Sequence, residues 1–170
     1  SIRHFYPDVP IYLLADEAAG RFSTEDAQKY WQVNLLNLGR RCWGNAGSRL
    51  SLLHADLRGR YLYIDSDICF LGRVLERLET VDAEFIVSGN LVPDPRDPHV
   101  AELYYDFDEL RRLDPEFVFP GYVFNGGQFV FTAGVIPRAR LESIFSMKAK
   151  PALKIPCIKA LDQGGLNYLL

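Results

Sequence analysis

Two carboxylates, Asp65 and Asp67, directly follow an apolar stretch near the middle of the chain. Residues 61–64 carry no charged side chain, a pattern typical of a parallel strand that is covered on both faces. Ligands bind at the carboxyl ends of the strands in open α/β sheets. Two carboxylates separated only by Ser66 suit Mg²⁺ or Mn²⁺, so the pattern predicts a cation that holds a phosphorylated substrate. The alternative is a helix N-cap beside a second, solvated acid.

Two further groups of residues suit the same chemistry. Asn125 offers a donor and an acceptor, and Gly126 and Gly127 let the backbone approach a ligand closely. By itself, this stretch predicts only a tight turn before a strand. Asp162 and Gln163 lie where a helix begins, where an Asp N-cap is the strong alternative.

Arg49 supplies positive charge to this set. It lies at the start of the helix that precedes the strand ending at Asp65, and one helix and a turn can bring it back to the strand end. The alternative is a solvated surface arginine. The three histidines have no ligand spacing to one another.

Apolar periodicity indicates which elements position these residues. The first residues are typical of the end of a helix. Strands are expected at 9–14, 61–64, 83–87 and 128–132, and helices at 24–38, 48–54, 74–78, 99–113 and 137–145 and from 161 onward. Strands that alternate with helices predict an α/β fold with a largely parallel sheet.

Composition limits the partners. The chain has 170 residues, a length that suits one domain or part of a larger one. Its net charge is −3, and it carries no basic stripe that would bind a nucleic acid polymer. No apolar run approaches the ~20 residues that span a bilayer, and no signal-peptide pattern opens the chain. Three widely spaced cysteines indicate no disulfide framework, which favours a reducing, cytoplasmic location. Because the ends resemble helix interiors, we expect residues 1–170 to be an internal segment of a longer protein.

Taken in order, these motifs resemble the nucleotide-sugar glycosyltransferases of the GT-A fold. The resemblance is closest to glycosyltransferase family 8, the glycogenin-like and bacterial lipopolysaccharide glycosyltransferases. The matching motifs occur in order over residues 10–170: a helix with a basic residue, a strand running into Asp-Ser-Asp, then Phe-Asn-Gly-Gly, and then Asp-Gln with a following Leu-Asn. The family fold is Rossmann-like, with a mixed, mostly parallel sheet flanked by helices, and the resemblance implies a single domain of this kind that lacks parts at both ends.

The resemblance implies a metal-dependent, retaining hexosyltransferase that uses a nucleotide-sugar donor, with UDP-glucose or UDP-galactose favoured. A glycan, a lipid-linked glycan or a protein would be the acceptor. The resemblance also implies a role for each residue. Asp65 and Asp67 would bind Mn²⁺ or Mg²⁺, Ser66 would lie by the ribose, and Arg49 would lie by the phosphates. The sugar pocket would be lined by Asn125, Gly126 and Gly127, and the anomeric carbon would be faced by Asp162 and Gln163.

The chain departs from the family pattern at Gly126, where the family has Ser or Ala. The family's base-binding strand and its third metal ligand, a histidine, are expected outside residues 1–170, so this segment alone is expected to bind metal weakly. Two other functions stay open. One is a haloacid-dehalogenase-like phosphatase that uses Asp65 and Asp67, although no acidic pair follows a later strand. The other is a non-catalytic domain that binds a sugar nucleotide.

Overall fold

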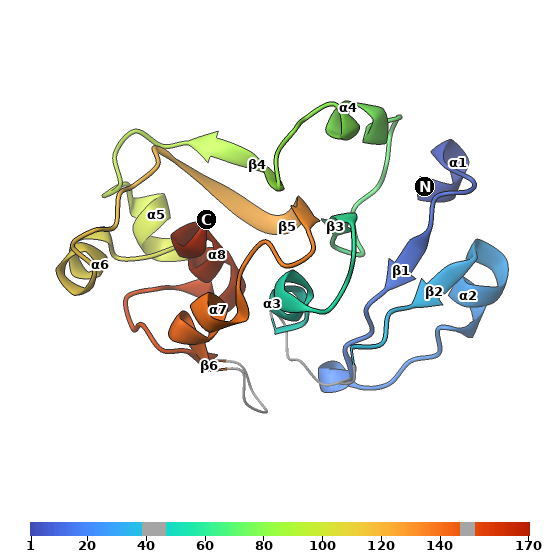
Figure 1. The fold of residues 1–170 in the computed structure, drawn as a ribbon, viewed down its shortest axis with the longest axis horizontal. Coiled ribbons are helices and arrows are strands. Elements are labelled where there is room, and N and C mark those ends of the chain that lie inside the picture. Colours follow the sequence, from blue (N-terminus) through green and yellow to red (C-terminus); the bar gives the residue numbers. More distant parts are fainter. Residues whose placement is uncertain (39–46, 147–151) are drawn as a thin grey trace.

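The computed structural model describes residues 1–38, 47–146 and 152–170, which form a mixed α/β arrangement (Figure 1). The helices are α1 (Ile2–Phe5), α2 (Glu25–Trp31), α3 (Gly47–His54), α4 (Leu75–Glu79), α5 (Pro98–Leu103), α6 (Phe107–Leu113), α7 (Arg138–Ile144) and α8 (Gly165–Leu169), with a 3₁₀ turn, η1 (Glu17–Ala19), and a π-helical turn, η2 (Ala160–Gly164). The strands are β1 (Ile11–Leu13), β2 (Val33–Leu35), β3 (Arg60–Ile64), β4 (Phe85–Leu91), β5 (Tyr122–Thr132), β6 (Phe145–Ser146) and β7 (Ala152–Leu153). None of these described helices is long and apolar enough to cross a membrane.

The main sheet has the strand order β3–β5–β4, and both of its pairings are antiparallel. β6 and β7 also pair antiparallel, whereas β1 and β2 form a separate parallel pair. The prediction of a mostly parallel sheet is therefore wrong for the pairings that the structure describes. The prediction failed because a continuous apolar run indicates burial but carries no information on strand direction. Here the chain passes from β4 through α5 and α6 and returns as β5 between the two earlier strands (Figure 1).

Aromatic pairs hold β5 to both of its neighbours. Phe129 stacks on Tyr63 of β3 at 4.9 Å and on Phe85 of β4 at 5.2 Å, and Phe131 stacks on Tyr61 at 5.6 Å. Cross-strand aromatic pairs of this kind stabilise antiparallel pairing. Successive side chains of a strand point to opposite faces of the sheet, and these rings are two residues apart on β3 and on β5, so they all lie on one face.

That face is covered by α3, α7 and α8, which lie on one side of the sheet in Figure 1. The core there consists of Leu50, Leu52, Leu53, Phe124, Phe129, Phe131, Ile136, Leu141, Ile144, Phe145, Leu166 and Leu169. Residues 61–64 of β3 are only half-buried, so the prediction of a strand covered on both faces is wrong. β3 is an edge strand that pairs with β5 alone among the described strands.

A second core cluster joins the helices α5 and α6 to the segment before η2. Asp97 and Asp106 cap the two helices by accepting hydrogen bonds from the backbone N–H groups of His99 and Glu109. Tyr105, which is fully buried, forms a β-bridge with Ile158. This contact places the chain that enters η2.

The helix expected at 24–38 is shorter than the apolar spacing indicated. α2 ends at Trp31, because Gln32 adopts a left-handed backbone conformation with φ of 51°. Val33 then pairs in register with Ile11 of β1. The apolar residues whose spacing predicted one helix face are therefore divided between the end of α2 and the strand β2.

The hydroxyl of Tyr6, the residue that follows α1, caps α4. It accepts hydrogen bonds from the backbone N–H groups of Val74 (2.5 Å) and Leu75 (2.9 Å) and donates to Glu76 at 2.8 Å. Val74, the N-cap residue, makes no side-chain cap of its own. The first helix is thereby fixed to the segment that follows Asp67.

Candidate functional site

Arg49 lies between two carboxylates that are far apart in the sequence. Its Nη2 pairs with Oδ1 of Asp65 at 3.0 Å, and its Nη1 pairs with Oδ2 of Asp162. The arginine side chain is only 17 % exposed. The alternative of a solvated surface arginine is therefore excluded, and the predicted approach of Arg49 to the end of β3 is confirmed.

Asp65 is held at the end of β3 by three hydrogen bonds. Its backbone N–H donates to the carbonyl of Gly127 at 2.8 Å and so extends the ladder between β3 and β5. Its Oδ1 accepts from Arg49 and also from the hydroxyl of Tyr63, at 2.8 Å. No described residue donates a hydrogen bond to Oδ2, which therefore remains available to a ligand.

Tyr63 belongs to the site although the sequence analysis did not select it. The guanidinium of Arg49 lies over its ring at 5.5 Å. Burial raises the pKa of the Tyr63 hydroxyl to about 12, although the charge of Arg49 opposes this shift. The hydroxyl thus remains a donor to Asp65 at neutral pH. Because residues two apart on a strand share a face, Tyr63 was recoverable from its spacing to Asp65.

Asn125, Gly126 and Gly127 lie within β5, so the prediction of a tight turn before the strand is wrong. The register of β4 against β5 shifts between the pairs Val87↔Phe129 and Gly89↔Phe124. This leaves residues 125–128 out of the ladder with β4, as a bulge. The Asn125 side chain accepts a hydrogen bond from the N–H of Gly127 at 2.8 Å, which supports the bulge locally.

The two glycines are needed for close approach. A Cβ added at Gly127 would lie 2.9 Å from Oδ2 of Asp65 and 3.2 Å from Oδ1 of Asn125. A Cβ at Gly126 would lie 3.3 Å from Nη1 of Arg49 and 3.9 Å from Oδ2 of Asp162. The backbone of β5 therefore forms one wall of the site.

Asp162 and Gln163 come from η2, on the opposite side of Arg49 from Asp65. The N-cap residue of η2 is Lys159, so Asp162 is not the helix cap that was its alternative. Gln163 faces Tyr104, where burial raises the pKa of the tyrosine hydroxyl and a hydrogen bond with Gln163 opposes the rise. Asn167, one turn later, donates to the carbonyl of Gln163 at 2.8 Å and was also not selected as a site residue.

Ser66 and Asp67 lie in an exposed turn after β3, in which the N–H of Ile68 donates to the carbonyl of Asp65 at 3.2 Å. α4 begins only at Leu75, so the alternative that these acids cap a helix is wrong. Among the described residues, no hydrogen bond or ion pair joins either side chain of the turn to Arg49 or Asp162. The structure therefore unites Arg49, Asp65, Asp162 and the bulge, and leaves Ser66 and Asp67 at its solvent edge.

The carboxylates of this site suit a hard divalent cation. Oδ2 of Asp65 and the exposed carboxylate of Asp67 are free of hydrogen bonds from described residues, and Gly127 leaves space beside the former. No group of three or more His, Cys, Asp or Glu side chains that could hold a metal occurs in the described ranges. Mg²⁺ often binds through one or two carboxylates and takes its remaining ligands from water and phosphate, so Asp65 and Asp67 are the residues that could hold such an ion.

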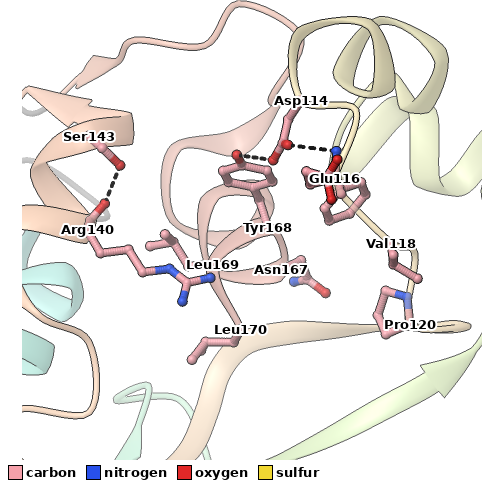
Figure 2. Close-up of a pocket in the computed structure, with 11 residues that line it drawn as sticks. Asp114, Glu116, Val118, Pro120, Arg140, Ser143, Asn167, Tyr168, Leu169 and Leu170 are labelled. Atoms are coloured by element: carbon pink, nitrogen blue, oxygen red, sulfur yellow. Dashed lines mark hydrogen bonds between the residues drawn. The ribbon is translucent and has the colours of Figure 1, made fainter.

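A hollow of about 330 Å³ lies elsewhere, beside the end of α8 (Figure 2). Tyr168 donates from its hydroxyl to Asp114 at 2.8 Å there, and burial, followed by this bond, raises the pKa of Tyr168 to about 12. Asp114 also accepts from the N–H of Glu116 at 3.1 Å. None of the predicted site residues lines this hollow.

Comparison of the chain with models of protein families, with curated proteins and with solved structures found no match.

Proposed function

We propose that the chain is a metal-dependent glycosyltransferase of the GT-A type, similar to family 8. It would transfer a hexose from a UDP-sugar to a glycan, a lipid-linked glycan or a protein, with retention of anomeric configuration. One observation carries the proposal: residues from four separate stretches of sequence, Arg49, Asp65, the bulge at 125–127 and Asp162, meet around a single guanidinium. A sugar-nucleotide site needs this combination of carboxylates, a cation and closely approaching backbone.

The breaking bond joins C1 of the sugar to an oxygen of the diphosphate, and the bonding electrons leave with that oxygen. Asp65 and Asp67 would hold Mn²⁺ or Mg²⁺, which would supply positive charge beside the diphosphate. Arg49 is the only described cation beside Asp65, and its guanidinium is suited to a phosphate oxygen. These groups would stabilise the negative charge that develops on the leaving diphosphate.

Asp162 and Gln163 would serve the sugar side of the same bond. C1 gains oxocarbenium character as the bond breaks, so a carboxylate or an amide oxygen nearby is stabilising. Asp162 lies across Arg49 from Asp65, which suits a sugar placed beyond the diphosphate. Gly126 and Asn125, on the bulge, would line the sugar pocket, and the exposed Ser66 would contact the ribose.

Replacing Asp67 by Ala in the full protein tests the proposal. Activity with Mn²⁺ and UDP-glucose or UDP-galactose should fall by roughly 100-fold or more, as for loss of one group that stabilises developing charge. Asp82→Ala is the matched control, because Asp82 is also an exposed aspartate outside the site. Retention of wild-type activity by Asp67→Ala contradicts the metal assignment.

A thermal-shift screen of the wild-type protein with Mn²⁺ and a panel of sugar nucleotides would identify the donor. Stabilisation by a UDP-sugar without any turnover would leave a binding domain and exclude the transferase. Stabilisation by none of the sugar nucleotides would contradict both functions.

A further inference from the structure

The guanidinium of Arg49 neutralises two carboxylates at once. It bridges Asp65 and Asp162 in the structure, which contains no other described cation beside either carboxylate. Two carboxylates brought together at a partly buried site repel each other unless a positive charge lies between them. The arginine therefore holds the two carboxylates together.

The same arrangement opposes a divalent cation. Oδ1 of Asp65 already accepts from Arg49 at 3.0 Å, so an ion on Asp65 would lie close to the guanidinium. Like charges at such separations repel strongly in a poorly hydrated site. Arg49 and the metal therefore compete for Asp65.

The structure also provides for release of Arg49. Its Nε is buried and has no hydrogen-bond acceptor in the described ranges, so one guanidinium donor is unused. Gly126 presents no side chain beside Nη1, where a Cβ would lie 3.3 Å away. An anionic oxygen that reached Nε would satisfy this free donor and draw the guanidinium away from the carboxylates.

We infer that Arg49 is an exchangeable cation, which neutralises Asp65 and Asp162 before metal and nucleotide bind and moves to the diphosphate when they bind. The inference rests on the proposed function and adds the regulation of that site. Metal and nucleoside diphosphate then bind cooperatively, because each favours the released position of Arg49. Such coupling is reciprocal, so each raises the affinity for the other by the same factor.

Mn²⁺ binding to the full protein, measured by the electron paramagnetic resonance of free Mn²⁺ with and without UDP, tests the inference. Without UDP, Arg49→Gln should bind Mn²⁺ more tightly than the wild type, by about fivefold if the displaced ion pair is worth ~1 kcal/mol. The enhancement of Mn²⁺ affinity by UDP should be smaller in Arg49→Gln than in the wild type. Arg138→Gln is the matched control, because it removes one charge from an exposed Arg138–Glu142 pair outside the site and should match the wild type.

Two results would overturn the inference, and a second variant covers the case in which Arg49→Gln does not fold. Unchanged or weaker Mn²⁺ binding by Arg49→Gln without UDP would mean that Arg49 positions Asp65 rather than competes for it, and the proposed function would stand. Loss of Mn²⁺ binding in the wild type, with and without UDP, would remove the proposed function as well. If Arg49→Gln does not fold, Arg49→Lys is measured instead, because its ammonium cannot bridge both carboxylates with a planar fork. Tighter Mn²⁺ binding by Arg49→Lys without UDP supports exchange, and weaker binding excludes it.

Discussion

At the scale of single residues, the site depends on the absence of a side chain at Gly127. Its backbone carbonyl accepts the N–H of Asp65, and its own N–H donates to Asn125. Both hydrogen bonds hold the glycine in place, so the neighbours of a new methyl group would have to move instead. The nearest neighbour is the carboxylate oxygen of Asp65 that is free for a ligand.

Gly127→Ala should therefore impair the site more than the fold. The added Cβ would lie 2.9 Å from Oδ2 of Asp65, so the carboxylate must turn away from it. Affinity for Mn²⁺ should fall by roughly 10–100-fold, the range seen when the orientation of a metal ligand is lost. Gly72→Ala is the control, since a Cβ there meets nothing within 4 Å. Equal Mn²⁺ affinity in the two variants would contradict this role of Gly127.

The approach of Arg49 to Asp65 was predictable from chain order, because strand ends and helix starts are local features. Only the resemblance to a family placed Asp162 in the same site. Tyr63 and Asn167 were not selected. Tyr63 could have been found from its spacing of two residues to Asp65. The role of Asn167 depends on which partner lies across the site, a tertiary fact that its side chain does not signal by itself.

At the scale of elements, α4 is capped from outside its own sequence. Val74 cannot accept a hydrogen bond with its side chain, and the hydroxyl of Tyr6 accepts from the first N–H groups instead. The ring of Tyr6 is buried, and the guanidinium of Arg73 lies over it at 4.7 Å. A helix of five residues that is capped in this way depends on α1 for its stability.

Tyr6→Phe should reduce the free energy of unfolding by about 1–3 kcal/mol, because two N–H groups and one carboxylate lose a partner while the ring is kept. Urea unfolding followed by circular dichroism measures this change. Tyr61→Phe is the control, because the Tyr61 hydroxyl makes a single exposed hydrogen bond to the carbonyl of Arg58. A loss no larger than in Tyr61→Phe would show that the hydroxyl of Tyr6 is not an effective cap.

Most elements were predictable from the sequence, and their pairing was not. Helix 48–54 and strand 61–64 agree with α3 and β3 to within one residue at each end. The second half of the helix expected at 24–38 became β2, because pairing with β1 outweighed helical spacing. The prediction of parallel strands was wrong for the same reason, since strand direction is decided by pairing between residues far apart in the chain.

At the scale of the whole molecule, the buried side chain of Asn167 connects the main sheet to η2. Its Oδ1 accepts from the N–H of Phe124, and its Nδ2 donates to the carbonyls of Phe124 and Gln163. One amide thereby fixes β5, just before the bulge, to the turn that carries Asp162. The position of Asp162 beside Arg49 follows from this connection.

Asn167→Asp should destabilise the whole structure, because an ionised carboxylate of nearly the same shape would face the two carbonyls to which Asn167 now donates. We expect a loss of at least about 3 kcal/mol in the free energy of unfolding at neutral pH, since two buried acceptors lose their donor and a charge is buried. Burial raises the pKa of such a carboxyl, so the loss should be smaller near pH ~4, where the acid is neutral and costs less to bury. Asn125→Asp is the stability control: Asn125 is exposed, and its Oδ1 only accepts from Gly127, which a carboxylate does equally well. Equal unfolding free energies for the two variants in urea, at both pH values, would mean that Asn167 does not connect the sheet to η2.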